Sequence, residues 1–132
     1  MIETQTRACA ISARESRGRT AYHAGLAAED QVSRLYDRSG RPVIARRWRG
    51  SIGEIDLIAR EGDTVVFIEV KKSSSHALAA EHLTWSQRQR IMATASEFVG
   101  GEPLGQNTDI RFDVALVDAT GRIEIIENAL AA

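Results

Sequence analysis

Two short runs of residues, 54–60 and 65–71, alternate between apolar and other positions on either side of the dipeptide Gly62-Asp63. A period of two predicts β-strands, because successive side chains of a strand point to opposite faces. A two-residue loop with glycine at its first position predicts a type II′ turn, and that turn sets the register of the two strands. The chain is therefore expected to fold around an antiparallel hairpin with two chemically different faces.

The predicted register separates an apolar face from a charged one. The apolar pairs are Ile55 with Val70, Leu57 with Ile68, and Ala59 with Val66. On the charged face Asp56 lies opposite Glu69. Glu54 lies opposite Lys71. Two opposed carboxylates, with Cβ atoms about 5 Å apart, are destabilising unless a shared proton, a basic neighbour or a divalent cation relieves them. The alternative is an ordinary solvated face on which Lys71 bridges the acids.

This charged face has the residue types of a metal site. Mg²⁺ is commonly held by one or two carboxylates, which makes Asp56 and Glu69 candidates. An ammonium group at Lys71 would orient a water or stabilise charge on a phosphate. Glu29 borders the apolar stripe of a predicted helix, where an unpaired acid costs free energy. It is either a third carboxylate of the same site or a side chain that extends to water.

The remaining elements follow from apolar periodicity and turn residues. They are a helix from about residue 20 to a Gly-Pro stop at 39–42, a strand at 43–49, a polar connection at 72–82, a helix at about 84–99, and strands at 110–118 and 122–126. Thr84 is the expected N-cap of the second helix, and Trp85 one of its apolar positions. The order α-β-β-β-α-β-β predicts a mixed sheet flanked by helices. Residues 1–18 are expected to form a mobile arm, and residues 19–132 a single domain.

The formal net charge of −1 hides an uneven distribution. Residues 1–60 carry a balance of +4, residues 61–90 are neutral, and residues 91–132 carry −5. Of the 17 basic residues, only Lys71 and Lys72 are lysine. Because arginine binds phosphate in bidentate geometry, the arginine-rich half favours a nucleic-acid partner, with a solvated charged surface as the alternative.

Three arginines of the predicted first strand, Arg46, Arg47 and Arg49, are the best candidates for contacts to a nucleic-acid backbone. The alternative is a charged edge strand that protects the sheet against aggregation.

Several protein classes are disfavoured. No apolar run approaches the ~20 residues of a membrane helix, so no membrane partner is expected. The N-terminal segment lacks the apolar core of a secretory signal. The single cysteine, Cys9, cannot form an intramolecular disulfide or hold a structural zinc alone. We therefore expect a reduced, cytoplasmic protein.

Residues 53–72, GEIDLIAREGDTVVFIEVKK, resemble the signature of the YraN-like family of small bacterial proteins. That family in turn resembles the PD-(D/E)xK nucleases, which are restriction-endonuclease-like and include Holliday-junction resolvases. Residues 25–29 (GLAAE), 111–114 (RFDV) and 126–130 (IENAL) resemble further motifs of the family. The resemblance implies a restriction-endonuclease-like α/β fold, a three-layer sandwich with a central mixed sheet between helices.

The resemblance also implies roles for individual residues. Asp56 and Glu69 would be metal-binding acids, Lys71 the catalytic lysine and Glu29 an additional helix carboxylate. The main-chain carbonyl of Val70 would be a further metal ligand, and the metal would be Mg²⁺ or Mn²⁺.

Two further positions are expected to contact nucleic acid. Gln87 stands where the family commonly has a lysine, early in the second helix. Lys72 directly follows the catalytic lysine.

The function implied is metal-dependent endonucleolytic hydrolysis of DNA phosphodiester bonds, at branched or otherwise structured substrates, and by analogy in a homodimer. The main alternative is a catalytically silent nucleic-acid-binding module or adaptor with the same fold. A third reading is a protein-interaction domain whose acidic C-terminal half docks a basic partner.

Overall fold

The computed structural model describes residues 13–72 and 84–129. Its elements are α2 (Ala13–Arg38), β1 (Val43–Arg49), β2 (Glu54–Glu61), β3 (Thr64–Lys72), α4 (Trp85–Val99), the 3₁₀ turn η1 (Gly105–Asn107), β4 (Ile110–Val117) and β5 (Ile123–Ile126). Cys9 and most of the polar connection predicted at 72–82 lie outside the described residues.

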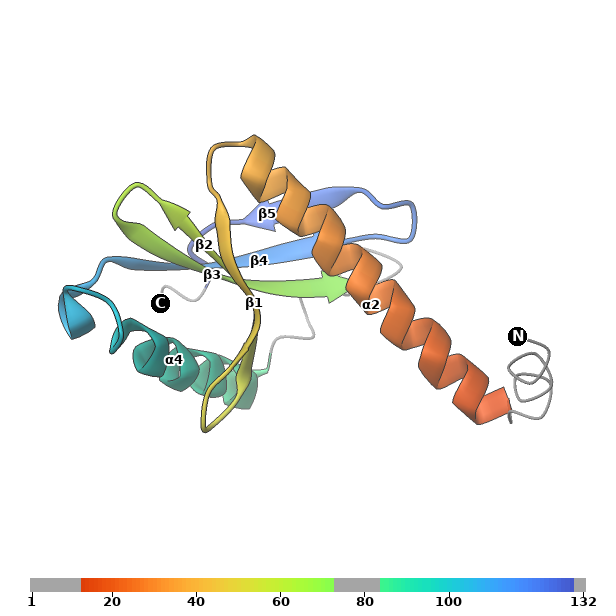
Figure 1. Ribbon diagram of the computed structural model, residues 1–132. Coiled ribbons are helices and arrows are strands. Elements are labelled where there is room, and N and C mark those ends of the chain that lie inside the picture. Colours follow the sequence, from red (N-terminus) through yellow and green to blue (C-terminus); the bar gives the residue numbers. More distant parts are fainter. Residues whose placement is uncertain (1–12, 73–83, 130–132) are drawn as a thin grey trace, which may run out of the picture.

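The strands form one five-stranded sheet in the order β1-β2-β3-β4-β5. The β3–β4 pair is parallel and the other pairs are antiparallel, so the sheet is mixed. The parallel pair needs a crossover connection, and α4 supplies it. Helices α2 and α4 lie on opposite faces of the sheet (Figure 1). The predicted fold class, an α/β three-layer sandwich around a mixed sheet, is confirmed.

Each helix covers its own core. On one face, Val32 and Tyr36 of α2 are fully buried among strand residues that include Leu57 and Ile68. On the other face, the α4 residues are buried against four residues of β2 and β3, namely Ile55, Ile58, Val65 and Phe67. Because both faces of β2 and β3 are buried, these two strands form the rigid centre of the molecule.

The hairpin between β2 and β3 has the predicted turn and register. Gly62 has a φ of 59°, the left-handed value that the first position of a type II′ turn requires. Leu57 pairs with Ile68 and Ala59 with Val66, as predicted.

One predicted pair on the apolar face is wrong. Ile55 packs in the α4-side core, whereas Leu57 and Val70 belong to the α2 side. The reason is that the β2–β3 ladder ends at Leu57 and Ile68. Beyond it, the amide of Val70 donates a hydrogen bond to the side chain of Asp56, at 2.8 Å. Without a continuous ladder, the strict alternation of faces is lost.

The two helices differ from the prediction in one feature each. Helix α2 begins at Ala13, earlier than residue 20 and inside the expected arm, and its N-terminal part extends beyond the sheet (Figure 1). Alanine, arginine and glutamate in this stretch are strong helix formers, which favours the longer helix. Trp85, expected on an apolar face, is 74% exposed at the first position of α4.

Thr84 caps α4 as predicted. Its hydroxyl accepts from the amide of Gln87, and the Gln87 side chain accepts from the amide of Thr84. Among the described residues, no helix is long and apolar enough to cross a membrane.

Candidate active site

The two central strands part from each other at the predicted acidic pair. After Leu57 and Ile68, β2 continues to pair with β1, and β3 continues to pair with β4. Asp56 and Glu69 are the next residues of the two strands. The two carboxylates therefore stand directly beyond the end of the β2–β3 ladder.

Asp56 is held in place by the main chain of the neighbouring strand. Its Oδ2 atom accepts the hydrogen bond from the Val70 amide, which favours the charged form. Burial has the larger effect and raises the pKa of Asp56 above its ordinary value, and the charge of Glu29 raises it further. The site thus orients a carboxylate and at the same time makes its negative charge costly.

Glu69 has the stronger perturbation. Burial, followed by the charge of Asp56, raises the pKa of Glu69 to about 8, while Lys71 opposes the shift. Near neutral pH the pair therefore retains a proton, which is one of the three forms of relief expected from the sequence.

Lys71 supplies the second form of relief, a basic neighbour. Its Nζ atom lies 3.7 Å from Oε1 of Glu69, and the two side chains are 17% and 19% exposed. Glu54, predicted to lie opposite Lys71, instead forms an ion pair with Arg49 at 3.4 Å. The end of the β2–β3 ladder accounts for this difference, because Glu54 stays beside β1 while Lys71 follows β3.

Glu29 is buried, as its position beside the apolar stripe predicted, with 7% of the residue exposed. Arg47 holds it in bidentate geometry, with Nε 3.1 Å from Oε1 and Nη2 3.4 Å from Oε2. Arg47 reaches it from a left-handed backbone conformation with φ 50°. Glu29 therefore lies near enough to influence Asp56 electrostatically, but its oxygens are engaged by a guanidinium.

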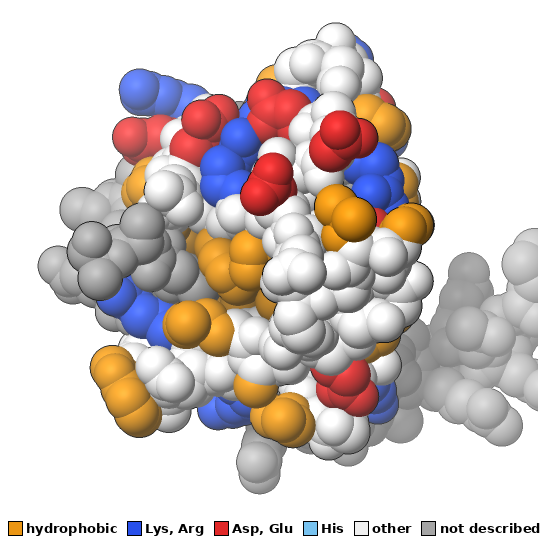
Figure 2. Space-filling view, turned by 90° about the vertical axis from the view of Figure 1, so that its left-hand side faces the viewer, with side chains coloured by type: hydrophobic (Ala, Val, Ile, Leu, Met, Phe, Trp, Pro, Cys, Tyr) orange, Lys and Arg blue, Asp and Glu red, His pale blue; other side chains and the backbone are white. Residues whose placement is uncertain are grey.

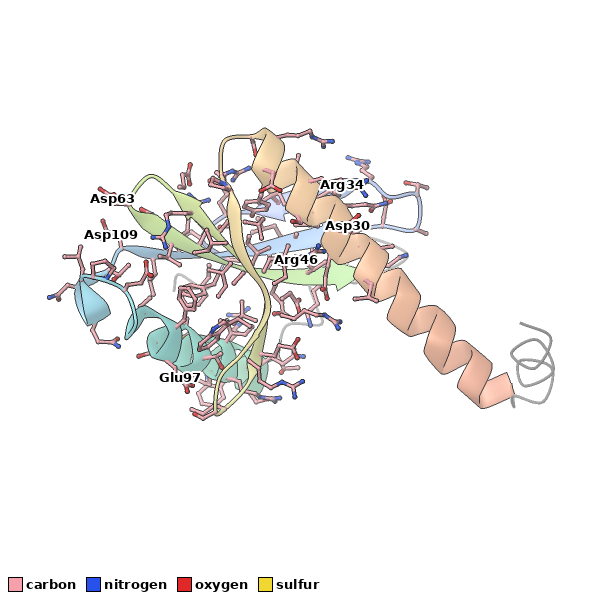
Figure 3. The ribbon with its side chains drawn as sticks, viewed as in Figure 1. Asp30, Arg34, Arg46, Asp63, Glu97 and Asp109 are labelled. Carbon is pink, nitrogen blue, oxygen red and sulfur yellow. The ribbon has the colours of Figure 1, made fainter. Side chains whose placement is uncertain are left out.

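The other predicted phosphate contacts are mostly engaged with acids too. Arg46 of β1 lies 3.7 Å from Asp30 of α2, and both side chains are labelled in Figure 3. Lys72 is exposed at the end of β3. Acidic and basic side chains also lie interspersed on the face shown in Figure 2. The arginine-rich first half of the chain thus does not produce a simple basic surface on β1.

A cavity of about 230 Å³ adjoins Glu69. It lies between the β1–β2 loop, the end of β3 and the first turns of α4, and its lining residues are Ile52, Gly53, Glu54, Glu69, Gln87, Arg90 and Ile91. Gln87, predicted to contact nucleic acid, lines this cavity while it caps α4. Arg90 was missed by the sequence reasoning. Its spacing of three from Gln87 on a predicted helix was the signal that could have found it.

A buried polar network accounts for two of the motifs outside the hairpin. Asp113 accepts a 2.7 Å hydrogen bond from the hydroxyl of Tyr36, a bidentate pair of bonds from Arg111, and a bond from the amide of Asn128. These contacts fasten α2 and the C-terminal turn to β4. The RFDV and terminal motifs therefore have a structural role here, and Tyr36 belongs with them.

The acidic side chains of the site can be compared with the ligands that a metal ion requires. Among the residues whose side chains the structure describes, no three His, Cys, Asp or Glu are grouped closely enough to hold a metal. The side-chain donors are thus Asp56 and Glu69. Two carboxylates whose pKa values are raised by burial fit a hard cation such as Mg²⁺, whose remaining ligands are commonly water and phosphate.

The comparisons with known proteins agree on one family. The model of the uncharacterised protein family UPF0102 matches residues 28–117. A UPF0102 protein of Cereibacter sphaeroides strain KD131 is 69% identical over 115 residues, covering 87% of this chain and 98% of that protein. UPF0102 proteins of Ruegeria pomeroyi (57% over 119 residues, 90% and 97% covered) and Dinoroseobacter shibae (43% over 127 residues, 96% and 95% covered) are also similar. The matched segment contains Glu29, Asp56, Glu69 and Lys71.

Proposed function

Because the chain belongs to the UPF0102 family and carries two opposed carboxylates beside a lysine, we propose that it is a metal-dependent nuclease that hydrolyses DNA phosphodiester bonds. The observation that carries the proposal is the pair of Asp56 and Glu69 beyond the end of the ladder, with the pKa of both raised. A sheet with a purely structural hairpin gains nothing from such a pair. A site that binds a cation and a phosphate, in contrast, uses such a pair of carboxylates.

In this proposal Asp56, Glu69 and the main-chain carbonyl of Val70 hold Mg²⁺ or Mn²⁺. The cation, when bound, supplies Lewis-acid stabilisation of the negative charge on the phosphate. The Val70 amide keeps Asp56 oriented. Lys71, beside Glu69, donates hydrogen bonds to the attacking water or to a phosphate oxygen.

Glu29 assists from helix α2. Held by Arg47, it adds negative charge near Asp56, which raises the pKa of Asp56 and would also attract a divalent cation. Direct or water-mediated contact of Glu29 with the metal remains part of the proposal and requires Arg47 to release at least one oxygen.

The proposed substrate is DNA, with branched or structured forms favoured by the resemblance to resolvases, and the proposed location is the cytoplasm. A symmetric homodimer is proposed by the same analogy.

A catalytically silent DNA-binding module is the second candidate. It is favoured by the pairing of Glu29 with Arg47 and by the lack, within the described residues, of a third metal-ligating side chain. Metal-dependent turnover separates it from the nuclease.

The test is a cleavage panel of linear, nicked, flap, single-stranded and four-way DNA with Mg²⁺ or Mn²⁺. We expect the wild-type chain to cleave at least one substrate, and Asp56→Asn, Glu69→Gln and Lys71→Ala to lose at least about 100-fold in rate. Asp63→Asn, in the exposed hairpin turn, is the matched control and should cleave normally. Unchanged cleavage by a pure Glu69→Gln preparation would refute the assignment.

A further inference from the structure

The cavity next to Glu69 contains Arg90, which differs from most of the other arginines whose side chains the structure describes. Seven arginines form ion pairs with carboxylates, namely Arg34, Arg41, Arg46, Arg47, Arg49, Arg60 and Arg111. Arg90 lines the cavity and forms no ion pair with a carboxylate in the described part of the chain. A guanidinium that lines a cavity and forms no ion pair with a described carboxylate has the chemistry to bind an anion.

The stem of Arg90 is packed against the β1–β2 loop. A Cβ atom added at Gly53 would lie 3.2 Å from Cγ and 3.3 Å from Cδ of Arg90, and 3.1 Å from Oγ1 of Thr94. The absence of a side chain at Gly53 thus lets the aliphatic part of Arg90 lie directly on the loop. Gly53 belongs to the GEID motif, and this contact gives it a role beyond turn geometry.

The size of the cavity limits what it can receive. Its volume of about 230 Å³ lies below the range of roughly 300–1,000 Å³ typical of sites that enclose a whole small molecule. Ile52 and Ile91 add apolar surface to its lining. The cavity is therefore suited to part of a nucleotide, such as a phosphate with its adjoining sugar.

We propose that Arg90 binds a backbone phosphate of the nucleic-acid strand in this cavity, and that Gly53 positions its side chain. This inference rests on the proposed nuclease function and names part of its substrate site. The β1 arginines are paired with acids. The proposed phosphate contact next to the carboxylates is therefore an arginine of α4 and not one of β1. Recognition of a phosphate and sugar makes binding here independent of base sequence.

The test measures binding separately from cleavage. Fluorescence anisotropy of a fluorescein-labelled single strand and of the matching duplex is recorded over a salt series, in EDTA and in Ca²⁺. We expect Arg90→Ala to bind about tenfold more weakly than wild type, with a log–log salt slope shallower by about one phosphate contact. Arg88→Ala is the matched control, because Arg88 is exposed on the same helix and does not line the cavity. It should change affinity by less than about twofold.

Gly53→Ala provides an independent variant. It presses on the stem of Arg90 and should weaken binding in the wild-type background, yet have little further effect when Arg90 is already alanine. If the wild-type chain cleaves DNA, Arg90→Ala should raise KM more than it lowers kcat.

The inference is overturned if Arg90→Ala binds as wild type does, if Arg88→Ala loses as much affinity, or if wild type binds no DNA. Loss of affinity confined to Arg90→Ala, in a chain that shows no metal-dependent cleavage, would refute the nuclease and still support the phosphate contact.

Discussion

At the residue scale, Glu69 makes the stability of the metal-free chain depend on pH. Its pKa rises from an ordinary value of 4.5 to about 8 on folding. Between these values the folded state binds a proton that the unfolded state lacks, so the stabilisation is complete below about pH 4.5 and is lost as the pH rises through 8. Asp56 shifts in the same direction. The pair thus favours folding at low pH and metal binding at high pH.

Urea unfolding in EDTA at pH 6 and pH 9 should therefore show wild type less stable at pH 9, by an amount on the order of a few kcal/mol. Glu69→Gln, which cannot lose the proton, should remove most of the difference. Asp63→Asn should retain it, because Asp63 is exposed in the hairpin turn. If wild type and Glu69→Gln lost the same stability between pH 6 and pH 9, the raised pKa of Glu69 would be contradicted.

At the scale of elements, α2 is tied to β4 by one buried hydrogen bond between side chains. Tyr36 is fully buried, and its hydroxyl donates to Asp113 at 2.7 Å. Replacing Tyr36 by Phe keeps the ring but leaves Asp113 with one partner fewer, so we expect a loss of about 2 kcal/mol in the free energy of unfolding. Asp113→Ala should cost more, because Arg111 also loses one of its two carboxylate partners. Chemical denaturation measures both, and a Tyr36→Phe variant as stable as wild type would show that the bond does not anchor α2.

The same elements show which parts of the fold could be read from the sequence. The hairpin register was predictable because a two-residue glycine turn and a period of two are local features. The side on which Ile55 packs was not, because the Val70 amide bonds to a side chain and the ladder ends. The partner of Glu29 was not predictable either, since Arg47 reaches it from a left-handed backbone conformation. Such long-range contacts carry no periodic signal.

At the scale of the whole molecule, the candidate site joins both layers of helix to the sheet. Glu29 approaches from α2, and Gln87 and Arg90 approach from α4, while the carboxylates lie on the central strands. In the part of the chain whose side chains the structure describes, seven arginines form ion pairs with carboxylates. Local positive charge at the site then depends on Lys71, on Arg90 and on a bound cation, and net charge is a poor guide to the partner.

The last prediction concerns the cation itself. Metal that binds only the folded chain raises the melting temperature, and a concentration ten times Kd corresponds to a rise of about 3–6 °C for a domain of this size. Because the cation displaces the retained proton, the rise should be larger at pH 8 than at pH 6. Calorimetry in two buffers of different ionisation enthalpy should show a proton released on binding near neutral pH.

Asp56→Asn and Glu69→Gln should abolish the metal-dependent rise, and Asp63→Asn should preserve it. If Mn²⁺ and Mg²⁺ stabilise Asp56→Asn as much as wild type, the cation binds elsewhere, and the opposed carboxylates are a structural pair that relies on its proton and on Lys71 alone.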